Sequence, residues 1–190
     1  TALAGGVPHF FVGTELRGLE SLSVMGDEVV PLLARRPWPF RRLERLSVRW
    51  CSSFTLPALN ELDVPALRHL ELAPNQGERE RLPGVLAKLE PVVGRLESLR
   101  VERLGDEPTL RALLAKTRLR RLELDSPSVV FHRVRNVWVL EVLRTPKRLP
   151  SLSALLPLVA AIVEPDARWG DRRAGVRADL QRLGLELVQL

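Results

Sequence analysis

Leucine and valine recur along the chain in a short phrase of fixed spacing. In residues 43–51, apolar side chains occupy the first, fourth and sixth places, and a cysteine occupies the ninth. Copies of the pattern L-x-x-L-x-[LV] begin at Leu19, Leu43, Leu67, Leu96, Leu119 and Leu180. The second leucines of the first five copies lie 24, 24, 29 and 23 residues apart. This regular spacing predicts a repeat architecture in which each phrase forms one short strand.

The segments between the phrases predict a second layer. Residues 29–33, 82–93 and 110–114 carry apolar side chains at helical spacing. A further copy of the phrase at residues 59–64 lies too close to the next one to be a repeat of its own. We interpret it as an extended return segment on the outer side, because Pro57 and Pro65 flank it. The unit is therefore strand, turn and helix, and parallel strands joined by helical crossovers follow.

Beyond residue 125 the pattern loosens. Residues 128–134 and 137–143 are rich in β-branched and aromatic residues, and Arg135-Asn136 between them is either a tight turn or part of one long strand. The pattern then predicts an apolar helix over residues 152–163, a helix over 174–182 and a closing strand over 185–190. We interpret residues 126–190 as divergent repeats and a cap, because the end of a repeat stack must hide one face from water.

The phrase and its ninth place resemble the leucine-rich repeat family, most closely the bacterial or ribonuclease-inhibitor-like types with helical return segments. The resemblance implies an α/β leucine-rich repeat solenoid, a curved parallel sheet with helical or irregular return segments and an atypical C-terminal cap. We expect a single domain over residues 1–190, with regular repeats over 16–125. In the family an asparagine or cysteine at the ninth place turns inward and bonds the loop backbone. That column contains Asp27, Cys51, Asn75, Leu104 and Pro127, of which the first three suit the role.

Strand alternation predicts which side chains leave the core. The third, fifth and seventh places of each phrase face away from the stacked leucines, towards the concave side of the sheet. We expect partner binding there by Ser21, Ser23, Met25, Arg45, Ser47, Arg49, His69, Glu71, Ser98, Arg100, Glu102, Arg121, Glu123 and Asp125, with Ala73 in the same set. Arginines and acids are mixed on this face and tryptophan and tyrosine are missing from it. The alternative is a solvated sheet whose charges pair along the ladder.

Composition adds a competing hypothesis. The net charge is +6, with 12 basic and 11 acidic residues up to position 95 and 17 basic and 12 acidic residues after it. Basic clusters lie at residues 118–121, 133–148 and 168–177, and Trp138 and Trp169 nearby are suited to stacking on bases. The other interpretation is that arginine is the general surface residue of a chain with only three lysines, and that these tryptophans close the end of the stack. Trp38 and Trp50 are interpreted as packing at turns.

Motifs with a known reaction mechanism are missing from the sequence. It has no glycine-rich phosphate loop, no G-x-S-x-G and no H-E-x-x-H. His9, His69 and His132 lack a second histidine or cysteine at ligand spacing, so we expect no metal, no cofactor and no catalytic residue. Cys51 is expected to be a buried structural thiol, because its place in the repeat faces inward.

Location follows from what the chain lacks. One cysteine cannot form an internal disulfide, which favours a reducing compartment. The longest apolar run, residues 155–163, is interrupted only by Pro157 and is far shorter than the roughly 20 residues of a membrane span. We therefore expect a cytoplasmic protein without a membrane partner. The chain begins at Thr1 and its single methionine is Met25, which favours a piece of a larger protein.

The sequence therefore predicts a non-enzymatic binding module that recognises a protein partner through the concave face. The alternatives are binding of nucleic acid or another acidic ligand by the basic C-terminal half, and a scaffold or recognition domain within a larger multidomain protein. A repeat scaffold hosts many unrelated functions, so the fold alone does not choose among them.

Overall fold

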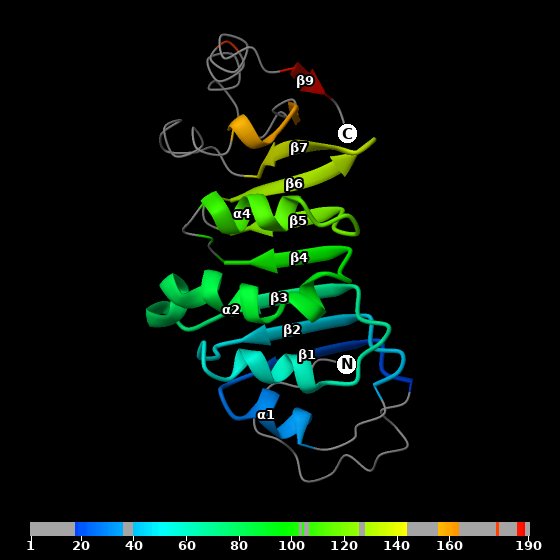
Figure 1. The fold of residues 1–190 in the computed structure, drawn as a ribbon, viewed down its shortest axis with the longest axis vertical. Helices are drawn as coiled ribbons and strands as arrows, with labels where there is room; N and C mark the ends of the chain where they lie inside the picture. The colour runs from blue at the N-terminus through cyan, green and yellow to red at the C-terminus, as the bar shows by residue number, and fades with distance from the viewer. Residues whose placement is uncertain are drawn as a thin grey trace.

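The computed structural model describes residues 18–35, 40–102, 104, 107–125, 128–143, 156–163, 178 and 186–188. Within these residues, nine strands form one open sheet whose strand order follows the sequence from β1 to β9. Figure 1 shows them stacked as a ladder from β1 at one end to β9 at the other. The fold is α/β, and its sequential strand order is compatible with a solenoid-like arrangement.

The first five strands form a parallel ladder. They are β1 (Ser21–Met25), β2 (Arg45–Arg49), β3 (His69–Ala73), β4 (Ser98–Val101) and β5 (Arg121–Leu124). Their register places Leu22, Leu46, Leu70, Leu99 and Leu122 in one row. All five leucines are buried, so the predicted alignment of the five phrases is confirmed. A slip of one residue would turn this whole row to the opposite face, and burial of the row therefore fixes the register.

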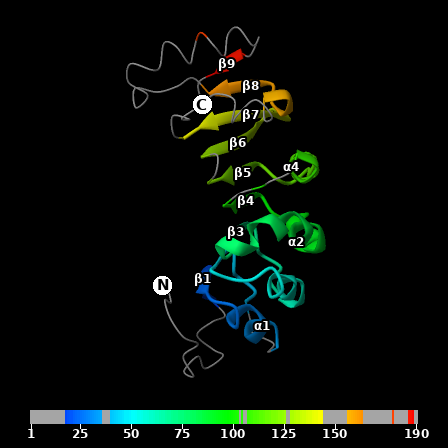
Figure 2. The same cartoon turned by 90° about the vertical axis from the view of Figure 1, so that its left-hand side faces the viewer.

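Helices fill the segments where helical returns are predicted. They are α1 (Val29–Ala34), α2 (Leu82–Lys88), α3 (Glu90–Val93) and α4 (Glu107–Leu114), and the 3-10 helix η3 (Gln76–Arg81) precedes α2. In Figure 2 the helices α1, α2 and α4 lie on one side of the β1–β5 ladder. Their apolar side chains pack with the leucine rows in one hydrophobic cluster. Full burial of such a side chain contributes about 1.5–3 kcal/mol.

The return segment after β2 differs from the prediction. A 3-10 helix, η2 (Leu56–Glu61), replaces the first half of the expected extended path over residues 59–64, and the backbone is extended at Leu62, where this helix ends. Pro57 stands in its first turn, where the missing N–H costs no hydrogen bond and the fixed φ suits a helix. Leu56 and Leu59 are buried from this helix, so the proline signal marked the start of a helical turn rather than an extended chain.

Strand direction changes after β5. Strand β6 (Val129–Val134) runs antiparallel to β5 and to β7 (Val137–Val142). Arg135 and Asn136 join β6 to β7 with φ values of 48° and 70°. Two successive left-handed residues are typical of a two-residue type I′ hairpin turn. Of the two interpretations of this stretch, the hairpin is the one found.

The sheet continues with two short parallel strands, β8 (Ala161–Val163) and β9 (Glu186–Val188). The apolar helix predicted over residues 152–163 is wrong for its described part, which forms a 3-10 turn, η5 (Leu156–Leu158), and then β8. Ile162 pairs in register with Leu140 of β7. This neighbouring strand favours the strand conformation, in which β-branched residues pack well. The closing strand is confirmed at β9. Of the helix predicted over 174–182, only Ala178 lies within the described residues, and it is helical.

Candidate binding site on the open face of the sheet

The strand surface opposite α1, α2 and α4 is called the open face. All the predicted partner-binding residues belong to it, and each is exposed or half-buried while the residues between them are buried. They form three rows across the strands. The first row is Ser21, Arg45, His69, Ser98 and Arg121, and the second is Ser23, Ser47, Glu71, Arg100 and Glu123. The third row contains Met25, Arg49 and Ala73 at the strand ends, with Glu102 and Asp125 directly after β4 and β5.

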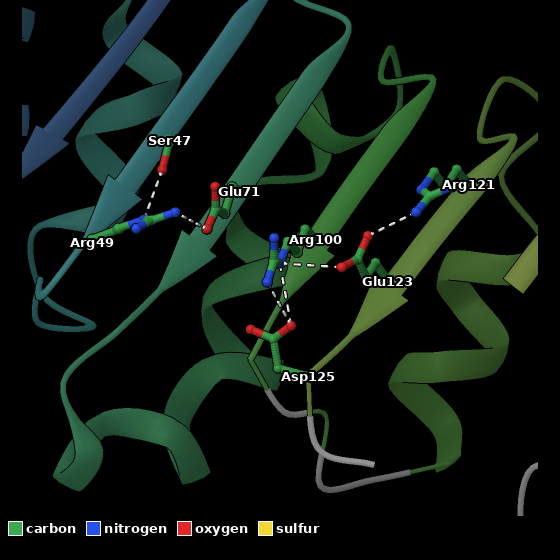
Figure 3. Close-up of polar contacts among 7 residues, drawn as sticks. All are labelled: Ser47, Arg49, Glu71, Arg100, Arg121, Glu123 and Asp125. Carbon is green, nitrogen blue, oxygen red and sulfur yellow. Dashed lines mark hydrogen bonds and ion pairs between the residues drawn. The ribbon is translucent and has the colours of Figure 1, made fainter. Parts of the chain in front are cut away.

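Ion pairs connect neighbouring strands across this face (Figure 3). An Nη of Arg49 on β2 donates to Oε1 of Glu71 on β3 at 2.8 Å. Nε of Arg49 donates to Oγ of Ser47 on the same strand at 3.3 Å. The arginine side chain therefore lies along the sheet surface, bridging two strands.

A second cluster centres on Arg100 of β4. Its guanidinium lies 3.0 Å from Oδ1 of Asp125 and 3.4 Å from Oε1 of Glu123. Glu123 is also 3.0 Å from the guanidinium of Arg121 on its own strand. The charges thus pair along the ladder, as the solvated-sheet alternative expects, and the pairing fixes the side-chain directions shown in Figure 3.

Three carboxylates act on the guanidinium of Arg100. Partial burial opposes the charge of its guanidinium, but the hydrogen bond to Asp125 and the carboxylates of Asp125, Glu123 and Glu71 outweigh that cost. The pKa of Arg100 is therefore raised above its ordinary value. These carboxylates therefore stabilise the charged form of Arg100.

Burial interrupts the open face beyond β5. In the hairpin, Val130 pairs in register with Glu123, and Val139 pairs with His132. Both valines are buried although they occupy open-face positions. The half-buried pair of His132 Nε2 and Glu141 Oε2, 2.8 Å apart, lies at this border. The uninterrupted accessible surface is therefore that of the five parallel strands, and Val134 and Val137 are exposed again at the turn of the hairpin.

A hollow of about 470 Å³ opens at the carboxyl-terminal end of this surface. Its lining comprises Arg49, Trp50, Glu71, Ala73, Pro74, Asn75, Gln76, Arg100, Glu102 and Asp125. The arginines and acids of the lining belong to the predicted face. The loop residues from Pro74 to Gln76 were missed, because they follow β3 and lie outside the alternating pattern.

Trp50 is the main departure from the sequence interpretation. Trp50 is 66% exposed, so packing at a turn is wrong for it, and an aromatic residue does border the face. Its φ is 55°, and its N–H donates to the Ala73 carbonyl at 2.7 Å. The repeat pattern contained a signal for this left-handed backbone, because the equivalent position of the preceding unit is Gly26, whose φ is also positive.

The ninth-place residues have two different roles. Cys51 is fully buried, and burial, aided by the charge of Asp27, raises the pKa of its thiol to about 11. The carboxylate of Asp27 accepts a hydrogen bond from the N–H of Ser52, which is the loop-bracing role expected of this column. Asn75 departs from it, because its side chain is exposed and only its backbone N–H bonds inward, to the Cys51 carbonyl. Leu104 packs against the core, and Pro127 lies outside the described residues.

The basic C-terminal half is less suited to binding nucleic acid than its composition indicates. Trp138 is buried and its indole N–H donates to the Leu114 carbonyl at 2.8 Å, so its suggested stacking on bases is wrong. Arg133 donates to the carbonyls of Lys116 and Thr117 and lies over the Trp138 ring. These residues pack the end of the parallel ladder. The basic residues at 144–148 and 168–177, with Trp169, lie outside the described residues, as does Trp38.

Metal-ligand clusters and membrane-spanning helices are absent from the described part of the chain. No group of three or more histidine, cysteine, aspartate or glutamate residues there is placed to hold a metal ion. No helix in that part has the length and apolar character needed to cross a membrane. His69 is half-buried on the open face.

The geometry defines an open α/β sheet in which one strand surface is bare of the described helices. Comparison of the chain with protein-family models, with curated proteins and with solved structures found no match. The leucine-rich repeat assignment therefore stays a prediction from the repeat pattern.

Proposed function

We propose that the chain is a leucine-rich repeat solenoid that acts as a non-enzymatic binding module and recognises a protein partner through the open face. One observation carries the proposal. The same set of positions in five successive strands presents polar and charged side chains, while the residues between them are buried. Continuous faces of this kind give a partner the large contact area that protein recognition needs.

The state of the charged groups favours recognition over catalysis. Arg49 is paired with Glu71, and Arg100 is paired with Asp125 and Glu123, so each charge is held at a fixed place on the sheet. Side chains fixed in this way lose little conformational entropy when a partner binds. A catalytic acid or base instead needs a substrate proton within hydrogen-bond reach and a pKa near the working pH.

Site-specific photo-crosslinking tests the location of the partner surface. A photoreactive amino acid replaces Ser47, in the middle row of the open face, or Ala112, which is exposed on α4. In lysate of the source cells, we expect a discrete crosslinked product from position 47 and none from position 112. Equal crosslinking at both positions, or crosslinking at position 112 alone, contradicts the proposal.

A charge-matched pair of variants gives an independent test. Four arginines of the open face, Arg45, Arg49, Arg100 and Arg121, are changed to glutamine. In the control variant, four exposed arginines outside that face, Arg41, Arg42, Arg111 and Arg118, are changed instead. We expect the first variant to lose the partner crosslinked at position 47 and the control to retain it. Retention by both variants would remove the open-face charges from the recognition surface.

A further inference from the structure

Trp50 combines two unfavourable features at the rim of the hollow. Its φ is 55°, in the left-handed region, where a residue with a Cβ is less stable than glycine. The preceding unit has Gly26 at the equivalent position. Trp50 is also 66% exposed, although tryptophan is highly buried on average. Backbone strain of this kind gathers at functional sites, so a strained and exposed tryptophan beside a hollow indicates ligand binding.

The charged side chains around the hollow are engaged with partners. Arg49 is paired with Glu71 at 2.8 Å. Arg100 is paired with Asp125 at 3.0 Å. Glu102, the fifth charged residue of the described lining, also has a partner. A cationic ligand would have to compete with the arginines for their carboxylates, and an anionic ligand would have to compete with the carboxylates for the arginines. The hollow is therefore better matched to a ligand without charge.

Ion-paired groups still provide hydrogen bonds for an uncharged ligand. A guanidinium has more N–H donors, and a carboxylate has more lone pairs, than one contact between them uses. Asn75 and Gln76 are exposed in the lining, and each side-chain amide contributes donors and an acceptor. The lining therefore presents donors and acceptors together, next to the aromatic residue Trp50.

We propose that the hollow binds a neutral sugar, with one face of the pyranose ring against the Trp50 indole and the sugar hydroxyls hydrogen-bonded to the polar lining. A pyranose has the matching surfaces, because C–H groups make its ring faces apolar while its hydroxyls both donate and accept. The C–H groups carry a small positive charge and are attracted to the negative face of an aromatic ring. A volume of about 470 Å³ is within the usual range of small-molecule pockets. The inference goes beyond the proposed function and does not depend on it.

The indole N–H signals of the protein provide a direct measurement. The chain has four tryptophans, so a sample labelled at the indole nitrogen gives four signals, and Trp50→Phe assigns the one of interest. The probes are the methyl glycosides of glucose, galactose and mannose, the uronic acid and the 2-amino counterpart of each, and sorbitol. We expect the Trp50 signal to shift saturably with at least one neutral glycoside.

The remaining probes are matched controls for charge and for ring stacking. The charged counterparts of that glycoside should bind roughly two- to fivefold more weakly, the range of one exposed charge contact. Sorbitol has the hydroxyls of a sugar without a ring face, so it should leave the Trp50 signal in place.

Two exposed aromatic residues locate the site. Trp50 lines the hollow, whereas Phe54, which is 77% exposed, is not among the described lining residues. We expect Trp50→Gly to weaken binding of the neutral glycoside roughly two- to tenfold, the range of one aromatic contact, and Phe54→Ala to leave it unchanged. Trp50→Phe keeps an aromatic ring and should bind more tightly than Trp50→Gly. The backbone amide signals of Asn75 and Gln76 report binding in all three variants, and unchanged amide spectra away from the hollow establish that the variants are folded.

Several outcomes would overturn the inference. They are no saturable shift with any neutral glycoside, tighter binding of a charged counterpart, an equal shift with sorbitol, equal effects of Trp50→Gly and Phe54→Ala, or no difference between Trp50→Phe and Trp50→Gly. A Trp50 signal that moves with protein concentration alone would also overturn it, because a second copy of the chain would then fill the hollow. The proposed function is tested separately, by crosslinking at position 47, so each proposal can fail without the other.

Discussion

The left-handed backbone of Trp50 predicts an inverted order of stability for two substitutions at one position. At most sites alanine is the more favourable residue, because glycine loses more backbone entropy on folding, about 0.5–1 kcal/mol. At a φ of 55° a Cβ instead costs roughly 1–2 kcal/mol. We therefore expect Trp50→Gly to be more stable than Trp50→Ala by about 1 kcal/mol.

The comparison with the unsubstituted chain follows from burial. About a third of the Trp50 side chain is covered, which for a ring of about 200 Å² is roughly 70 Å² of surface. At about 25 cal/mol per Å² this burial contributes at most about 1.7 kcal/mol. Trp50→Ala loses that contribution and keeps the strain, while Trp50→Gly loses it and gains the relief. The free energy of unfolding of Trp50→Gly should therefore lie within about 1 kcal/mol of that of the unsubstituted chain, although the variant lacks the tryptophan side chain.

Urea denaturation followed by far-UV circular dichroism measures these differences without relying on tryptophan fluorescence. The matched control is Ala112→Gly in α4, an exposed helical position where glycine should cost about 1 kcal/mol. The exchange of alanine for glycine should thus have opposite signs at positions 50 and 112. If Trp50→Ala is as stable as Trp50→Gly or more stable, the strain argument is refuted.

Three further predictions concern the core and the hairpin. The pKa of Cys51 is about 11 in the folded chain against an ordinary 9.0, so the folded state holds the thiol proton more tightly. The free energy of unfolding should therefore fall as pH rises from about 9 to 11, and urea titrations should show a shallower fall for Cys51→Ser. Trp138→Phe leaves the Leu114 carbonyl without its donor and should lower the free energy of unfolding by about 1–3 kcal/mol in urea denaturation. Arg135→Asn suits the left-handed turn before Asn136 and should raise the free energy of unfolding by roughly 0.5 kcal/mol in the same assay.

The parallel ladder could be predicted because its determinants are local and repeated. Leu22, Leu46 and Leu70 occupy the same place in three copies of one phrase, and only one register buries all of them. The open-face row of Glu71, Arg100 and Glu123 follows from the same register. The repeat pattern therefore already determined which charged residues lie side by side.

The parts that could not be predicted depend on contacts between segments. Residues 161–163 have an apolar sequence that suits a helix or a strand, and the free edge of β7 decides for the strand. Trp50 follows an exposed arginine and precedes a buried cysteine, and its exposure results from a backbone turn held by the Ala73 carbonyl on the next strand. From the sequence alone, a tryptophan next to a buried residue is expected to be buried as well.

The sequential strand order of the sheet determines how the loss of one strand would affect the folding of the others. Each strand pairs only with its neighbours in the chain, so cooperativity passes from unit to unit as in a one-dimensional array. Loss of β1 would shorten the array by one unit and leave amide hydrogen-exchange protection in the β6–β7 hairpin unchanged. Loss of β3 would instead divide the array, and β1 and β2 would then have to remain folded on the contacts of a single strand pair. A two-stranded unit is only marginally stable, so the middle of the chain, rather than its ends, governs whether the open face exists as one surface.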